Sequence, residues 1–195
     1  MKALNFLVAG VGGQGALLAS NVLAEVGVQA GYDVKKAEIH GMSQRGGSVN
    51  SHVRWGEKLY SPLIGQGEVD YLVVLERLEA LRYLDMLRPG GTVLIGEMRI
   101  PPLTVSSGDD VYPDDDVIRQ QVGQKSDCLI LVPSLALAER AGTARAHNVV
   151  VLGALSSLLD EVPVEVWQQV IARRVPQRYV DVNMAAFEAG RQAAG

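Results

Sequence analysis

Short apolar runs alternate along the chain with longer stretches in which apolar residues recur every three or four positions. The apolar runs predict strands over residues 4–9, 71–75, 92–95 and 128–132, and residues 33–39 predict a second strand that completes a β-α-β unit. The longer stretches predict helices over residues 16–30, 79–87, 114–123, 135–140, 148–159, 163–173 and 177–194. Strands that alternate with helices are typical of an α/β fold. We therefore expect a three-layer, open, mostly parallel Rossmann-like sheet with helices on both faces.

Three other stretches have different patterns. Residues 48–55 alternate between apolar and polar side chains, which predicts a strand with one solvated face. Residues 59–64 predict a short extended piece. Residues 101–116 hold three of the eight prolines and five aspartates, and we expect an excursion or loop there. The three consecutive acids Asp114 to Asp116 favour a solvated helix start over a metal site.

A glycine-rich turn joins the first predicted strand to the first helix. Glycine adopts positive φ and lets a ligand approach the backbone closely. The first amides of a helix have no intrahelical partners and attract a phosphate or carboxylate. The same spacing also suits tight packing between strand and helix, so both interpretations stay open. The candidate binding residues in this turn are Gly10, Gly12, Gly13, Gln14 and Gly15.

A second glycine-rich segment carries a single cation, Arg45. If strand 33–39 lies next to strand 4–9, this segment emerges at the same carboxyl edge as the first turn, where open α/β sheets bind ligands. A guanidinium suits bidentate contact with phosphate or carboxylate. The alternatives are a solvated cation or a pair with Glu38. The candidate binding residues here are Arg45, Gly46, Gly47 and Ser48.

The other residues that could bind a ligand or take part in catalysis are an acid, three histidines and the serines. Glu38, about 20 residues beyond the glycines, has the spacing of an acid that binds an NAD ribose, which keeps an NAD-dependent enzyme as an alternative. His40, His52 and His147 have no ligand-spaced partners, and we expect them to satisfy backbone groups. No Gly-x-Ser-x-Gly elbow surrounds a serine, which argues against a serine nucleophile, and no Cys or carboxylate stands at ligand spacing from the histidines. We therefore predict no catalytic residue and no metal ligand in this chain.

Composition narrows the class of protein. The length of 195 residues fits a single domain, 1–195, and the two Phe and two Trp predict a mostly aliphatic core. A net charge of −4 argues against nucleic-acid partners. Cys128 is the only cysteine, which excludes an internal disulfide or a cysteine-held cluster and favours a cytoplasmic location. No run approaches the roughly 20 apolar residues that span a bilayer, so we expect no membrane association.

The two glycine segments continue into further motifs along nearly the whole chain. Residues 41–47, Gly-Met-Ser-Gln-Arg-Gly-Gly, are the most specific of these, and 101–125 the least. The remaining motifs are residues 51–54, 61–64, 76–80, 148–154 and 175–176, with Asp70, Arg82, Asn183, Phe187 and Gly190. Together they resemble the γ-type subunits of the 2-oxoacid:ferredoxin oxidoreductase family, and most of all its indolepyruvate-type members.

This resemblance implies a subunit of an enzyme that oxidatively decarboxylates an aryl 2-oxoacid, transfers the acyl group to coenzyme A and passes electrons to ferredoxin. It places thiamine diphosphate, Mg²⁺ and [4Fe–4S] clusters on a larger partner subunit, so we expect this chain to be inactive alone. The isolated chain is expected to have a homodimer contact. We infer that the glycine turn and residues 45–48 help to hold coenzyme A or the substrate carboxylate. A stand-alone module that binds coenzyme A or a nucleotide is the other alternative.

Overall fold

The computed structural model describes residues 3–40 and 47–194, and its strands form one six-stranded sheet in the order β2-β3-β1-β4-β5-β6. Four strands, β1, β4, β5 and β6, are parallel neighbours. The strands are β1 (Leu4–Val11), β2 (Asp33–His40), β3 (Ser48–Gly56), β4 (Val69–Glu76), β5 (Leu87–Met98) and β6 (Cys128–Val132). The expected open, mostly parallel sheet is confirmed.

The expected neighbour relation between the first two strands is wrong. β3 lies between β1 and β2 and is antiparallel to both. The short connection from β2 to β3 accounts for their antiparallel pairing, because a parallel crossover takes a dozen or more residues and only 41–47 are available. Since β3 is antiparallel to both neighbours, β1 and β2 still end at the same edge of the sheet.

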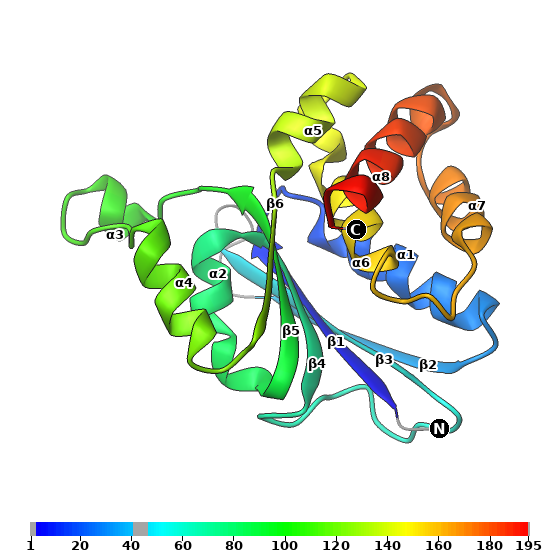
Figure 1. The fold of residues 1–195 in the computed structure, drawn as a ribbon, viewed down its shortest axis with the longest axis horizontal. Helices are drawn as coiled ribbons and strands as arrows, with labels where there is room; N and C mark the ends of the chain where they lie inside the picture. The colour runs from blue at the N-terminus through cyan, green and yellow to red at the C-terminus, as the bar shows by residue number, and fades with distance from the viewer. Residues whose placement is uncertain (1–2, 41–46, 195) are drawn as a thin grey trace.

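Helices cover both faces of the sheet, as expected for three layers. Figure 1 shows α1 and α5 to α8 on one face, and α2 and α4 on the other. The α-helices are α1 (Ala16–Gln29), α2 (Arg77–Arg82), α3 (Leu103–Ser106), α4 (Asp115–Gly123), α5 (Ser134–Ala141), α6 (His147–Ser156), α7 (Val164–Arg174) and α8 (Val180–Ala194). Three short 3₁₀ helices are η1 (Leu84–Met86), η2 (Ala144–Ala146) and η3 (Gln177–Tyr179). Within the described ranges, none of the helices has the length and apolar character that crossing a membrane requires.

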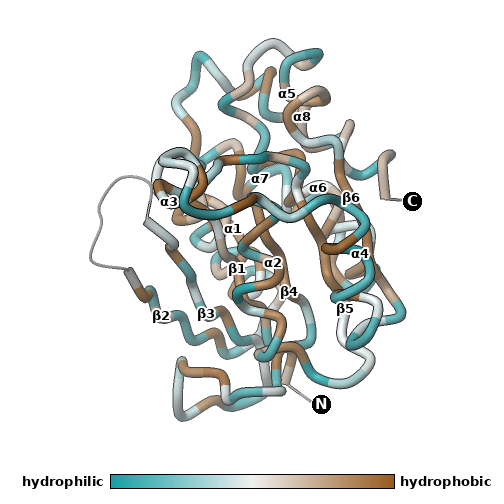
Figure 2. Tube along the Cα trace, turned by 90° about the vertical axis from the view of Figure 1, so that its left-hand side faces the viewer, coloured by the Kyte–Doolittle hydropathy of each residue, from teal (hydrophilic) through white to brown (hydrophobic). Residues whose placement is uncertain are grey.

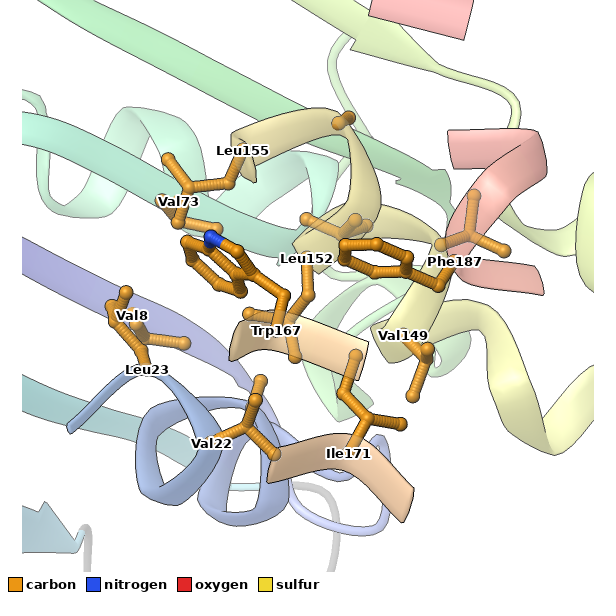
Figure 3. Close-up of a cluster of buried hydrophobic side chains, with 14 of the residues drawn as sticks. Val8, Val22, Leu23, Val73, Val149, Leu152, Leu155, Trp167, Ile171 and Phe187 are labelled. Carbon is orange, nitrogen blue, oxygen red and sulfur yellow. The ribbon is translucent and has the colours of Figure 1, made fainter. Parts of the chain in front are cut away.

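Alternate residues of the central strands supply two hydrophobic cores. Phe6 and Val8 of β1 face the larger core under α1 and α5 to α8, whereas Leu7 and Ala9 face the smaller core under α2 and α4. Figure 3 shows the larger core, where residues of α1, α6, α7 and α8 meet strand residues. In Figure 2 the central strand β1 is mostly hydrophobic and the edge strand β2 mostly hydrophilic, which is typical of an edge exposed to solvent.

The larger core contains all four Phe and Trp side chains in a mostly aliphatic setting. Their ring centroids are separated by 4.8 Å between Phe6 and Trp55, and by 6.4 Å both between Trp55 and Trp167 and between Trp167 and Phe187. All four rings are fully buried. The few aromatic residues of this chain therefore tie β1, β3, α7 and α8 together.

The prediction of a solvated face on the third strand is wrong. Asn50 and His52 of β3 are buried, and they contact Tyr83, which lies between α2 and η1, and Ile64 of the segment after β3. Asn50 Nδ2 donates to the Tyr83 hydroxyl over 2.9 Å, and His52 Nδ1 accepts the Ile64 amide over 3.0 Å. Polar residues at alternate positions here satisfy buried partners instead of meeting water.

The helix expected over residues 79–87 and the extended piece expected over residues 59–64 also differ from the prediction. The helix expected over residues 79–87 begins at Arg77, because the Glu76 carboxylate accepts the amides of Leu78 and Glu79 as an N-cap. It ends at Arg82 and is followed by η1, after which β5 already begins at Leu87. Residues 59–64, expected to be a short extended piece, contain no strand.

Candidate functional site

The glycine turn between β1 and α1 is held by the side chain of Gln14. Its Oε1 accepts the Val11 amide over 2.7 Å, and its Nε2 donates to the Leu75 carbonyl over 3.3 Å. The Gln14 amide in turn donates to the Val11 carbonyl. Gln14 is buried, so in this structure its polar atoms face the protein and brace the turn.

Two positions in the turn require glycine for different reasons. Gly13 has φ +101° and Gly15 has φ +81°, a region that other residues rarely adopt. A Cβ at Gly15 would also lie 2.3 Å from Asn148 Nδ2, whereas a Cβ at Gly13 would meet nothing within 4 Å. The backbone of Gly13 is therefore open to close approach, and that of Gly15 is closed by α6.

The start of α6 supports the turn from behind. Asn148 Nδ2 donates to the Gly15 carbonyl over 3.1 Å, and His147 hydrogen-bonds the backbone of Gln14. Burial lowers the pKa of His147 to about 4, so its imidazole is neutral at pH 7. Sequence reasoning did not identify this pair as a support of the turn, and the Asn-Val-Val motif that begins at Asn148 was the available signal.

The expectation that histidines satisfy backbone groups is confirmed for His52 and His147. The side chain of His40 lies outside the part of the chain that the structure describes. Across residues 3–40 and 47–194, no three His, Cys, Asp or Glu side chains are grouped so that they could hold a metal ion.

The second glycine segment meets the first turn directly. The Gly12 amide donates to the Gly47 carbonyl over 2.9 Å, and Val11 pairs with Ser48 in the antiparallel register of β1 and β3. Gly47 and Ser48 thus lie beside the turn at the carboxyl edge of the sheet. Arg45 and Gly46, also predicted as binding residues, fall outside the described residues.

The turn forms one wall of a depression of about 370 Å³. The Gly12 amide is already bonded, but the amides of Gly13, Gly15 and Ala16 have no acceptor among the described residues. α1 carries no acidic residue in its first turn that would compete for an anion. The depression is lined by Val11, Gly12, Gly13, Gly15, Ala16, Leu17 and Val49. The polar atoms that line the depression belong to the backbone, and backbone amides at a helix start can bind an anionic group without help from side chains.

Ser48 belongs to a polar cluster with residues of α2 and with Tyr83, which directly follows α2. Its hydroxyl donates to the Glu79 carboxylate and lies 2.8 Å from the Tyr83 hydroxyl, and Arg82 Nε donates to Glu79 over 3.1 Å. Burial raises the pKa of Glu79, although the bonds from Ser48 and Arg82 oppose that shift. Sequence reasoning missed Glu79 and Tyr83, because only the fold brings α2 against the start of β3.

The position of Glu38 argues against an ordinary NAD site. In dinucleotide-binding folds the ribose-binding acid follows the strand adjacent to the first strand. Here β3 separates β2, which carries Glu38, from β1, and Lys36 Nζ donates to the Glu38 carboxylate. The insertion of β3 therefore moves this acid one strand away from the glycine turn.

The chain is similar to known proteins over nearly its whole length. The family model described as pyruvate ferredoxin/flavodoxin oxidoreductase matches residues 5–193. Indolepyruvate oxidoreductase subunit IorB of Thermococcus kodakarensis is 41% identical over 202 residues, which cover 100% of this chain and 97% of that protein.

Two solved structures share the fold. Pyruvate oxidoreductase subunit PORC of Thermotoga maritima has a TM-score of 0.73 and 23% identity, and the match covers 99% of this chain and 97% of that one. The 2-oxoglutarate:ferredoxin oxidoreductase of Magnetococcus marinus, solved with 2-oxoglutarate, coenzyme A and succinyl-CoA bound, has a TM-score of 0.73 and 22% identity. That match covers 100% of this chain and 31% of the other. From the family match over nearly its whole length, this chain belongs to the pyruvate ferredoxin/flavodoxin oxidoreductase family.

Proposed function

We propose that this chain is the small, γ-type subunit of an oxidoreductase that oxidatively decarboxylates indolepyruvate or a related aryl 2-oxoacid. The supporting observation is the relative named as an indolepyruvate oxidoreductase subunit, which matches the whole chain at 41% identity and has nearly the same length. In this proposal residues 1–195 form one γ-type domain that works in the cytoplasm. The acyl group passes to coenzyme A and the electrons pass to ferredoxin.

The glycine turn and the segment from Arg45 to Ser48 are the proposed contact for coenzyme A or for the carboxylate of the oxoacid. Three features support it: the amides of Gly13 and Ala16, which have no acceptor within residues 3–40 and 47–194, the open space over Gly13, and the bond from Gly12 to Gly47 that joins the two segments. These donors fit a phosphate or carboxylate. The structural relative solved with coenzyme A bound is consistent with such a ligand.

The redox centres belong to a larger partner subunit in this proposal. Cys128 is the only cysteine of the sequence, and one thiolate does not hold a [4Fe–4S] cluster. Thiamine diphosphate with Mg²⁺ supplies the carbanion chemistry when bound to that partner. The role left for this chain is to bind and orient anionic groups, which agrees with a site made of backbone amides.

Reconstitution tests this function. We expect neither this chain nor the larger subunit from the same genome to reduce ferredoxin alone, and the two together to do so only when indolepyruvate and coenzyme A are both present. Pyruvate and 2-oxoglutarate serve as comparison substrates in the same assay. Failure of the two chains to form a complex, with no restored activity, would contradict the proposal. Binding of coenzyme A by this chain together with failure to form a complex with the larger subunit would instead favour a stand-alone module.

A further inference from the structure

Residues 99–114 form an arm that leaves the body of the protein between β5 and α4. Figure 1 shows this arm, with α3 at its end, extending beyond α4. Two large apolar side chains on the arm, Leu103 and Val111, are each 84% exposed. Isolated exposed apolar residues are common. Leu103 and Val111 lie on the same projecting arm, and neither side chain packs against the smaller core.

Both ends of the arm are fixed to one buried carboxylate. Glu76, at the end of β4, accepts the Ile100 amide over 3.0 Å where the arm begins, and it accepts the Tyr112 hydroxyl where the arm ends. The Arg99 guanidinium lies 4.3 Å from the centre of the buried Tyr112 ring. Because both ends are anchored, the arm presents its apolar side chains in a defined arrangement, which lowers the entropic cost of docking.

The charge of the arm selects the kind of partner. Residues 99–114 contain three aspartates, Asp109, Asp110 and Asp114, against one cation, Arg99, whose guanidinium lies over the Tyr112 ring, so the arm is net acidic. A second copy docked arm to arm would bring two acidic segments together, which costs energy. A surface with an apolar recess bordered by Lys and Arg is the complementary partner.

The arm also begins beside the candidate site. Gln14, which braces the glycine turn, lies with its Nε2 3.6 Å from the Sδ of Met98, the last residue of β5. The arm and the glycine turn therefore share the carboxyl edge of the sheet. A partner that docks on the arm would be adjacent to an anionic ligand at the turn.

We propose that the arm at residues 99–114 is a docking element for the larger subunit of the oxidoreductase, with Leu103 and Val111 inserted into an apolar recess surrounded by basic side chains. This inference rests on the proposed function, because it takes its partner from there. It adds the surface, the two anchoring side chains and the charge of the recess.

The test measures the affinity of the full chain for the larger subunit by isothermal titration calorimetry. The double variant Leu103→Ser, Val111→Ser removes apolar area without changing charge, and we expect about a tenfold loss of affinity for each side chain buried in the complex. The matched control is Tyr60→Ser, because Tyr60 is 85% exposed and lies in the segment after β3 at the opposite edge of the sheet. We expect the control to bind like the unaltered chain. Binding of the unaltered chain should also weaken as salt is raised, and less so for Asp109→Asn, Asp110→Asn.

The outcomes separate the two proposals. If the unaltered chain does not bind the larger subunit, the proposed function fails and the docking surface with it. If it binds and the double variant binds equally well, the docking proposal alone is overturned. Sedimentation of the isolated chain covers the remaining case: a homodimer that the double variant abolishes, with unchanged affinity for the larger subunit, would assign the arm to a second copy and overturn the proposal. Circular dichroism of each variant verifies that it is folded.

Discussion

Gly15 and its neighbours in space show how single residues set the shape of the candidate site. The positive φ of Gly15 ends the turn, and its carbonyl accepts the Asn148 side chain, which would occupy the space of any Cβ. Gly13 shares the left-handed conformation but has open space in front of it. Two glycines in one motif thus do different work: one is required by packing and strain, the other leaves the backbone accessible.

His147 provides a prediction about pH at this scale. Its pKa is lowered to about 4 in the folded protein against about 6.5 in an unfolded chain, so the unfolded state binds more protons between these values. Stability from this residue is therefore fully present above about pH 6.5 and is lost as the pH falls toward 4, by about 3 kcal/mol in total. Urea unfolding at pH 7.5 and at pH 5 measures the loss.

The His147→Gln variant separates the contribution of His147 to the pH dependence of stability from that of carboxylates, which titrate in an overlapping pH range. Glutamine retains a donor for the Gln14 backbone but does not take up a proton in this range. We expect the variant to lose less stability than the unaltered chain between the two pH values. Equal losses in the two proteins would show that His147 does not carry the dependence.

At the scale of elements, the contact between α6 and α8 is made by backbone. A Cβ at Gly153 would lie 2.0 Å from the Phe187 carbonyl oxygen, and one at Gly190 would lie 1.9 Å from that of Val150. The absence of a side chain at Gly153 and at Gly190 therefore allows the two helices to pack closely. The entire helix α6 is buried, so it acts as the central element of the larger core as well as the support of the glycine turn.

Gly190→Ala tests this contact. The added methyl would force the two helices apart, and we expect a loss of about 1–3 kcal/mol in the free energy of unfolding. Gly123→Ala, at the end of α4, is the matched control because its Cβ would meet nothing within 4 Å. Alanine has the higher helix propensity, so the control should be neutral or slightly stabilising. Chemical denaturation measures the free energy of unfolding of both variants, and equal values for the two would contradict the close approach of α6 and α8.

At the scale of the whole molecule, the candidate site lies at one edge of the sheet. The turn after β1, the start of β3 and the base of the arm all lie at the carboxyl edge. The segment that follows β3 lies at the amino edge, because β3 runs antiparallel to β1. A ligand or partner therefore reaches the glycine turn from the carboxyl edge of the sheet.

The proposed site predicts different effects for Arg45 and for a cation at the amino edge of the sheet. Arg45→Ala should raise the KM for coenzyme A or the oxoacid in the reconstituted complex by about ten- to hundredfold, the loss expected for a charge-assisted hydrogen bond. Lys58→Ala, an exposed cation after β3, should leave both constants unchanged. Steady-state kinetics with each substrate varied in turn provides the measurement. An unchanged KM for Arg45→Ala would remove this residue from the site.

Much of this architecture followed from local pattern, because apolar periodicity and glycine turns act over a few residues. The span of β6, the layered α/β class and the glycine turn before α1 were predictable on that basis. The position of β3 was not, although the short connection at 41–47 excluded a parallel crossover. Burial of Asn50 and His52, and the support of the turn by His147 and Asn148, depend on contacts between residues that are 12 to 133 positions apart.

By itself, the sequence determined which segments form strands and helices and where a backbone could come close to an anion, since these properties depend on side-chain type and neighbour spacing. Only the tertiary structure decided that an antiparallel strand separates β1 from β2, that Gly12 bonds to Gly47, and that Glu76 fixes both ends of the arm. The physical reason is that long-range pairing is chosen by the packing of the whole core. No single segment carries the information about which distant partner will satisfy its polar groups.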